Sequence, residues 1–256
     1  IKSKKSKTFS YIIKNYDRSI GASLSGEIAR LYGNYSLSKK PITLSFTGTA
    51  GQSFGAWNVS GLNITLNGDA NDYVGKGMAG GNIVIQSPKE LKTIASSTVA
   101  IGNTCLYGAT GGRLFVEGIV GERFAVRNSG CIAVVEGSGD HACEYMTGGA
   151  VIFLGKVGNN FGAGMTGGLS FVYDDNQILD SNINAESVEL VKIKPGKYRK
   201  HEEFIYKQIK SHYAKTGSLK AKQILDNFGN EVKKFYIIKP KSSNVDDLLV
   251  IINKAA

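Results

Sequence analysis

Apolar residues gather in short runs that recur along the first two thirds of the chain, each bounded by glycine or serine. Six runs follow a glycine-type break, and a seventh, earlier run lacks only the glycine pair: GLNITLNG (61–68), GGNIVIQS (80–87), GGRLFVEG (111–118), SGCIAVVEG (129–137), GGAVIFLG (148–155), GGLSFVYD (167–174) and PITLSFTG (41–48). Successive copies start 18 to 20 residues apart, except where residues 86–100 are inserted. Each copy has the length and composition of a short buried strand.

A repeat of about nineteen residues cannot bury its apolar side alone and must stack on its neighbours. Short strands between glycine corners predict an all-β, right-handed parallel β-helix of six to seven coils. Glycine suits the corners because they need a positive φ or a close backbone approach. In-register stacking predicts two interior ladders: Leu44, Ile64, Ile83, Leu114 and Val151, and Phe46, Leu66, Ile85, Val116 and Phe153.

Different patterns flank the repeat and predict α-helical ends. At the front, Leu24 and Ile28 lie on one helical face, with Ser23 or Ser25 as N-cap and Gly33 as C-cap. Behind the repeat we expect a helix ending at Gly217, a second helix capped by Ser218 and a strand-like run over 235–238. The predicted divisions are a basic segment with a capping helix (1–40), the β-helix (41–175), a helical extension (176–240) and a tail without clear organisation (241–256).

Composition and charge follow the same division. Of the 32 glycines, 26 fall between Gly48 and Gly168. The net charge of +10 comes from the flanks, because residues 15–191 hold eleven basic and fifteen acidic residues. A nucleic-acid-binding surface usually gathers basic and aromatic residues, which the glycine-rich body lacks, so we expect no nucleic-acid partner.

The cysteine count and hydropathy indicate a reducing compartment. Three cysteines form no disulfide framework, no window reaches the length of a membrane span, and residues 1–7 lead into no signal-type apolar region. We therefore expect a cytoplasmic protein without a membrane partner, or a plastid protein in a plastid-bearing source.

Two strings fit a dinucleotide-binding pattern, Gly75-Lys-Gly77-Met-Ala-Gly80 and Gly162-Ala-Gly164-Met-Thr-Gly167. That pattern must open a helix, whereas both strings lead directly into a strand at the same phase of the repeat. Corner glycines are therefore the favoured interpretation.

Metal-type side chains meet in Asp140-His141-Ala-Cys143-Glu144. His141 and Cys143 supply only two ligands, so a turn with a hydrogen-bonded histidine and a small buried cysteine is favoured over a metal site. Cys105 and Cys131 lie one to two coils away, which leaves an iron–sulfur site as the weaker alternative.

Acidic residues recur at similar phases near Arg123 and Arg127, at Asp69, Asp72, Glu122, Asp140 and Glu144. Paired carboxylates serve acid–base chemistry in solenoid sugar lyases and hydrolases, but polar groups that satisfy exposed turns are the favoured interpretation. Ile1 cannot be an amino-terminal nucleophile. We predict no catalytic, cofactor-binding or metal-binding residues in this chain.

Long ordered strings then resemble a known family. Residues 68–77 (GDANDYVGKG), 121–130 (GERFAVRNSG), 139–149 (GDHACEYMTGG) and 160–168 (NFGAGMTGG) are similar to the carboxy-terminal domain of the glutamate synthase large subunit. So are 18–27 (RSIGASLSGE) and 212–225 (HYAKTGSLKAKQIL). The resemblance runs from Arg18 to Pro240.

The resemblance implies a division of labour within the parent enzyme. In that family an amidotransferase domain hydrolyses glutamine, and a barrel domain with FMN and an iron–sulfur cluster reduces the imine formed from 2-oxoglutarate and ammonia. The β-helix holds these domains in register for ammonia transfer and binds no cofactor itself. The family's cluster cysteines belong to the barrel, so Cys105, Cys131 and Cys143 are not assigned to the cluster. The implied partners are the amidotransferase and FMN domains, in the same chain or as separate subunits, and an electron-donor subunit or ferredoxin.

Two other functions stay open from the sequence. One is a glycine-repeat subunit of another redox assembly, such as the formylmethanofuran dehydrogenase complex, although the strings at 68–77 and 121–149 favour glutamate synthase. The other is a free-standing carbohydrate-active β-helix, which the single tryptophan, Trp57, disfavours. The resemblance leaves the electron donor open among ferredoxin, NADH and NADPH, because all three types share this domain.

Overall fold

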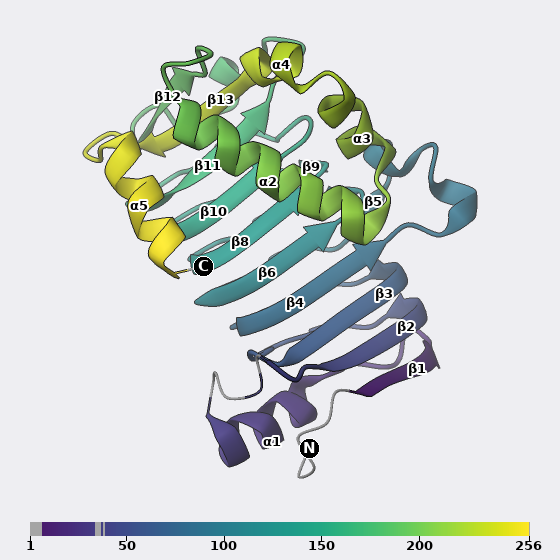
Figure 1. The fold of residues 1–256 in the computed structure, drawn as a ribbon. Helices are drawn as coiled ribbons and strands as arrows, with labels where there is room; N and C mark the ends of the chain where they lie inside the picture. Colours follow the sequence, from purple (N-terminus) through teal and green to yellow (C-terminus); the bar gives the residue numbers. More distant parts are fainter. Residues whose placement is uncertain (1–6, 34–36, 38, 256) are drawn as a thin grey trace.

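The strands of the chain stack into a β-solenoid of about seven turns (Figure 1). The computed structural model describes residues 7–33, 37 and 39–255. The strands are β1 (Lys7–Ile13), β2 (Ile42–Ala50), β3 (Leu62–Ala70), β4 (Ala79–Gln86), β5 (Val99–Ile101), β6 (Gly111–Val116), β7 (Ile119–Val120), β8 (Ser129–Val135), β9 (Gly137–Ser138), β10 (Thr147–Phe153), β11 (Gly167–Tyr173), β12 (Val188–Lys192) and β13 (Phe235–Pro240).

The predicted interior ladders are confirmed by the strand register. Parallel pairing places Leu44 beside Ile64, Ile64 beside Ile83 and Ile83 beside Leu114. Ala133 then lies between Leu114 and Val151. All five predicted members of the second ladder are buried as well. The core of the solenoid is therefore a set of stacked aliphatic and phenylalanine side chains, as the spacing of the repeat predicts.

A second, shorter strand face completes the coils. The end of β3 pairs with β5, β5 pairs with β7, and β7 pairs with β9, all in parallel. Gly48 and Gly68 lie where the chain turns from the first face to the second, with φ of 125° and 147°. A Cβ on Gly68 would lie 1.9 Å from the carbonyl oxygen of Gly48, so close backbone stacking requires glycine there.

The front of the solenoid differs from the sequence-based prediction in two ways. The parallel ladder begins before residue 41, because β1 pairs with β2 from Lys7 opposite Ile42 to Ile13 opposite Gly48. Helix α1 (Ala22–Tyr32) begins after Gly21 and has no side-chain cap, so the prediction of Ser23 or Ser25 as N-cap was wrong. Ser25 is buried within the helix, while Gly33 closes it as expected.

The other end carries antiparallel strands and most of the helices. Strand β13 runs antiparallel to β11, and β12 antiparallel to β13. The helices here are α2 (Arg199–Thr216), α3 (Leu219–Asp226), α4 (Phe228–Glu231) and α5 (Val245–Ala255), and the short 3-10 helices of the chain are η1 (Lys89–Leu91), η2 (Ala95–Ser97), η3 (Leu179–Ser181) and η4 (Val232–Lys234). Ser218 caps α3 as predicted, its Oγ accepting the backbone N–H of Ala221 at 2.9 Å.

The last residues are more ordered than expected. The sequence-based prediction of a tail without organisation over 241–256 was wrong for α5, whose residues Val245, Leu249 and Ile252 are buried. Their spacing of four and three residues is that of a helical face. None of the helices in the described residues is long and apolar enough to cross a membrane.

Helix α2 crosses the outer face of the main sheet, over the strands from β4 to β11 (Figure 1). Phe204, Ile205 and Ile209 belong to a second buried apolar cluster that also contains Phe115 and Phe171 from the sheet. The strands in this part are therefore buried on both faces, by the solenoid interior on one side and by the helices on the other.

Candidate functional site

The corners opposite the main sheet have a repeating left-handed backbone. In each coil every second residue over a five-residue stretch has a positive φ, as in Gly75 and Gly77 (65° and 63°) and in Arg123, Ala125 and Arg127 (57°, 59° and 55°). Backbone hydrogen bonds join these corners from coil to coil, for example from Arg123 N to Asp140 O at 2.8 Å. The first and third left-handed positions of each coil form a surface that we call the corner face: Ser53, Trp57, Tyr73, Gly77, Thr104, Gly108, Arg123, Arg127, His141, Tyr145, Asn160 and Gly164.

The two dinucleotide-like glycine strings are part of these corners and open no helix. The first leads into β4 and the second into β11. A Cβ on Gly77 would lie 2.8 Å from the ring of Trp57, and a Cβ on Gly164 would lie 2.5 Å from the ring of Tyr145. These glycines therefore leave room for an aromatic ring from the adjacent coil, which supports the corner interpretation.

The residues around His141 agree with the favoured interpretation of a turn with a hydrogen-bonded histidine and a small buried cysteine. The His141 Nδ1 lies 2.8 Å from Glu144 Oε1 and 3.1 Å from Asn160 Nδ2, all at the half-exposed surface. Cys143 is fully buried, with its Sγ 3.3 Å from Ser170 Oγ. Histidine and cysteine are thus in different environments. Within residues 7–33, 37 and 39–255, no three His, Cys, Asp or Glu side chains gather closely enough to hold a metal ion.

The three cysteines are core residues. Cys105, Cys131 and Cys143 are all buried in the apolar interior, and burial raises the pKa of each thiol to about 12. A cluster ligand or nucleophile must be a thiolate, which this environment opposes. The cysteines of this chain therefore do not fit the iron–sulfur cluster that the family resemblance implies for the whole enzyme.

The acidic ladder joins adjacent coils through backbone hydrogen bonds. Asp72 Oδ1 accepts the N–H of Asn103 at 2.7 Å, and Asp140 Oδ1 accepts the N–H of Asn159 at 2.7 Å. Asn103 Oδ1 likewise accepts the backbone N–H of Glu122, at 2.9 Å. These contacts agree with polar groups that satisfy exposed turns.

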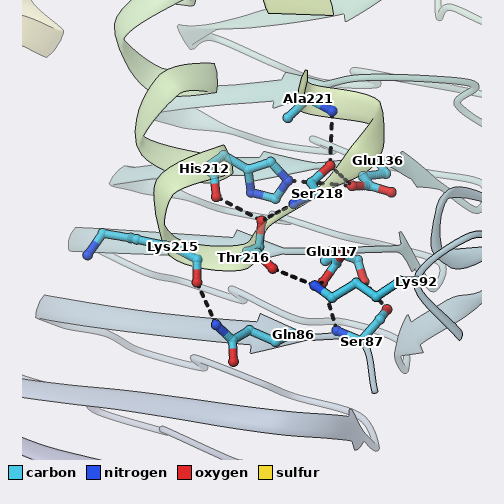
Figure 2. Close-up of polar contacts among 10 residues, drawn as sticks. All are labelled: Gln86, Ser87, Lys92, Glu117, Glu136, His212, Lys215, Thr216, Ser218 and Ala221. Carbon is cyan, nitrogen blue, oxygen red and sulfur yellow. Dashed lines mark hydrogen bonds and ion pairs between the residues drawn. The ribbon is translucent and has the colours of Figure 1, made fainter. Parts of the chain in front are cut away.

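Sequence reasoning missed a buried polar cluster where α2 and α3 meet the solenoid (Figure 2). Glu117 is fully buried and follows β6. Its carboxylate accepts the N–H of Ser87 at 2.9 Å and pairs with the ammonium group of Lys92 from the inserted segment. Lys92 also donates to the carbonyl oxygen of Thr216, the last residue of α2, at 2.6 Å. This chain of contacts ties the insertion and α2 to one coil.

The equivalent glutamate of the next coil makes a second tie. Glu136 is buried, and its Oε1 accepts a hydrogen bond from the hydroxyl of Ser218 (Figure 2). His212 Nε2 lies 3.6 Å from the same oxygen, and its ring stacks on Phe115 with centroids 6.1 Å apart. A glutamate inside each of the apolar runs FVEG and AVVEG was the available sequence signal for this cluster.

Serine, histidine and glutamate together suggest a hydrolase triad, but the geometry is different. The Ser218 hydroxyl donates a hydrogen bond to Glu136, and the His212 ring lies near the same carboxylate. No hydrogen bond joins the serine hydroxyl to the imidazole. Ser218 and His212 are fully buried, and the serine oxygen already caps α3. A triad needs a histidine that accepts the serine proton and a serine that substrate can reach. The cluster fastens helices to the solenoid.

A pocket of about 380 Å³ opens beside Glu136, at the end of the second strand face. Its charged lining residues include Lys156, Asp175 and Lys220, so the lining is of mixed sign. No single ligand chemistry follows from this lining.

Comparison with known proteins gives the lineage of this repeat. The model of the family described as "GXGXG motif" matches residues 1–241. The chain belongs to the GXGXG family. It is 49% identical over 240 residues to the ferredoxin-dependent glutamate synthase of Antithamnion sp., covering 94% of this chain and 15% of that protein. It is 51% identical over 235 residues to ferredoxin-dependent glutamate synthase 2 of Synechocystis sp., covering 92% and 15%.

A relative whose name gives a different electron donor is similar over nearly the same length. The chain is 44% identical over 243 residues to the NADPH glutamate synthase large chain of Bacillus subtilis, covering 94% of this chain and 16% of that protein. The resemblance to the carboxy-terminal region of glutamate synthases is therefore confirmed. This GXGXG chain spans about 15% of the length of these relatives.

Proposed function

We propose that this GXGXG chain is the scaffold domain of a glutamate synthase, which converts glutamine and 2-oxoglutarate into two glutamates. In this proposal the domain holds the amidotransferase and FMN domains in register for ammonia transfer and performs no chemistry of its own. FMN and the iron–sulfur cluster are bound by the other domains. The observation that carries the proposal is the 44–51% identity to glutamate synthases across more than nine tenths of this chain.

The structure supports a mechanical role. Coils joined by parallel strands and by hydrogen-bonded corners make a stiff body, because each repeat is packed on both sides. Two of the histidines are engaged otherwise. His212 lies in α2 and is buried against the main sheet, where its ring stacks on Phe115, and His141 is hydrogen-bonded to Glu144 and Asn160. Stiffness and a shaped surface are what a spacer between two active sites needs.

The proposal includes the finer points of the architecture. We infer a right-handed coil, because parallel strand crossovers are right-handed in nearly all proteins. We divide the chain into a solenoid up to residue 175, with β1 in its first coil, and a carboxy-terminal extension from residue 176 that includes α5. We place the enzyme in the cytoplasm, or in a plastid where the source has one, with ferredoxin or an electron-donor subunit as partner.

The test is to remove this segment from the enzyme that contains it. We expect glutamine hydrolysis to persist without matched consumption of 2-oxoglutarate, because the two half-reactions lose their register. Coupled synthesis of two glutamates per 2-oxoglutarate after the deletion would contradict the scaffold role. As a second test, the purified segment should show no flavin absorbance and no glutaminase activity, and FMN bound to it would overturn the proposal.

A further inference from the structure

The corner face retains large side chains at positions where the backbone favours glycine. Trp57, Arg127 and Tyr145 have φ of 55°, 55° and 53°, while the equivalent positions of other coils are Gly77 and Gly108. A residue with a Cβ is strained in this conformation, because its Cβ comes close to the following carbonyl oxygen, whereas glycine is not strained. Since the fold accepts glycine at this position, the bulky side chains are not needed to form the corner.

Contacts within the chain account for only part of these side chains. Trp57 and Tyr145 lie against glycines of the adjacent coil, yet they remain 57% and 56% exposed. Arg123 and Arg127 are exposed, and neither guanidinium has an ion pair or hydrogen bond among the described residues. Two strained, exposed arginines without partners next to a half-exposed tyrosine indicate a surface shaped for contact with another molecule.

Two nearby acids make other contacts. Asp140 Oδ1 accepts a backbone N–H, and Glu144 is bonded to His141. Tryptophan, tyrosine and arginine are the residues that most often dominate the energy of protein interfaces. The hydrogen-bonded corners hold these side chains on a rigid backbone, which lowers the entropy cost of docking.

The glutamate synthase-like strings meet at this place. Residues 121–130 supply Arg123 and Arg127, and residues 139–149 supply His141 and Tyr145. We propose that the corner face docks another domain of the same glutamate synthase, whose carboxylates pair with Arg123 and Arg127 and whose apolar surface covers Trp57 and Tyr145. This inference rests on the proposed function.

The experiment uses the intact enzyme with the photoreactive amino acid benzoylphenylalanine in place of Tyr145. We expect a cross-link to a peptide outside this segment, identified by mass spectrometry after digestion. The matched control carries the probe in place of Thr43, on the uncovered polar face of the main sheet, and should give no such cross-link. Cross-linking to a second copy of this segment, or to an unrelated protein, would overturn the inference.

Charge reversal tests the arginines. Arg123→Glu/Arg127→Glu should abolish the cross-link and lower glutamine-dependent glutamate synthesis roughly tenfold, with an unchanged thermal midpoint. Arg123→Lys/Arg127→Lys should keep most of the activity because it keeps the charge. The control Lys89→Glu/Lys207→Glu reverses the same number of exposed charges on other surfaces and should leave the activity unchanged.

The outcomes separate the two proposals. If the unmodified enzyme couples glutamine hydrolysis to glutamate formation but neither the cross-link nor the arginine effect appears, the docking inference fails and the proposed function stands. If the unmodified enzyme has no glutamate synthase activity, the proposed function fails, and the docking inference fails with it.

Discussion

The outer face of the main sheet has two regions, an uncovered one on the first coils and one covered by helices on the later coils, although the strands of both regions occupy equivalent positions in the repeat. The outward ladder that runs through equivalent positions begins with polar residues and continues with apolar ones: Ser45, Thr65, Val84, Phe115, Val134, Ile152 and Phe171. The first two are half-buried. From Val84 onward every member is buried in the cluster beneath the helices.

The difference shows that the outward residues are set by what covers them. On the first coils they face solvent, so the strands alternate between apolar and polar residues. On later coils helices such as α2 exclude water from this face, and the strands become continuous apolar runs, as in AVVEG and AVIFLG. The inward ladders, which face the same interior, remain apolar from β2 to β10. On β11 the first ladder continues with the buried Ser170, whose hydroxyl oxygen lies 3.3 Å from Cys143 Sγ.

The largest expected difference between the two surfaces comes from truncating an aromatic residue under α2. Phe171 is fully buried, with its ring centroid 5.7 Å from that of Phe204. Phe171→Ala should lower the free energy of unfolding by about 3–5 kcal/mol, because it leaves a cavity between sheet and helix. Thr65→Ala at the equivalent position should change it by less than about 0.5 kcal/mol. Urea denaturation of both variants measures this, and equal losses would contradict the comparison.

The next largest effect is expected at the buried ion pair between Lys92 and Glu117, in the helix-covered region. Lys92→Met leaves the carboxylate of Glu117 buried without its charged partner and should cost about 3 kcal/mol of unfolding free energy. Adding Glu117→Gln should recover most of the loss, since the buried charge is then removed. A double variant as unstable as Lys92→Met alone would show that the lysine acts through packing instead.

A smaller effect is expected from the polar ladder of the uncovered coils. Asn82 Nδ2 donates to Asn63 Oδ1 at 2.7 Å across adjacent strands. Because water can replace this bond, Asn82→Ala should lower the free energy of unfolding by only about 0.5–1 kcal/mol. In a double-mutant cycle, adding Asn63→Ala to Asn82→Ala should lower the free energy of unfolding little further, because the hydrogen bond is already lost. A loss as large as that of Phe171→Ala would remove the distinction between the two surfaces.

The smallest effect is a pH dependence at the covered end. The hydrogen bond from the Tyr173 hydroxyl, with the nearby ammonium group of Lys234, lowers the pKa of Glu231 below its ordinary value of 4.5. The folded protein therefore binds this proton less readily than the unfolded chain. The resulting stabilisation is present above pH 4.5 and is lost as the pH falls through the lowered pKa.

Glu231→Gln removes the titrating group and should flatten this part of the acid-unfolding profile. Urea midpoints between about pH 3 and pH 6 measure the slope. The matched variant Glu90→Gln, at an exposed glutamate of η1, tests whether the change is local. Identical slopes for wild type and Glu231→Gln would exclude the assignment.

Much of the solenoid follows from local sequence. The period places Leu44, Ile64 and Ile83 in one ladder because stacking of equal repeats admits only one register that keeps apolar residues inside. Strand β1 was not predicted because it lacks glycine boundaries. Its place in the ladder becomes evident only from its parallel pairing with β2. Helix α5 escaped because its apolar face is short and becomes evident only against the sheet.

The candidate sites divide in the same way. The corner interpretation of the glycine strings could be reached from their phase alone, whereas the reason for Gly77 and Gly164, an aromatic ring from the adjacent coil, could not. The acids at Asp72 and Asp140 were correctly suspected of satisfying turns. The cluster around Glu117 joins three segments distant in sequence, and no spacing rule connects Lys92 with Thr216.

The sequence by itself thus determined the repeat, the inward ladders and the family, because each is encoded within one coil or in contiguous strings. Only the tertiary structure decided which outward faces lie beneath helices and which corner side chains stay exposed, as Arg123 and Arg127 do. The physical reason is that burial of an outward residue depends on helices from a different part of the sequence, as Phe115 depends on His212 and Phe171 on Phe204. A left-handed corner such as that of Tyr145 likewise depends on hydrogen bonds with the coil that follows it.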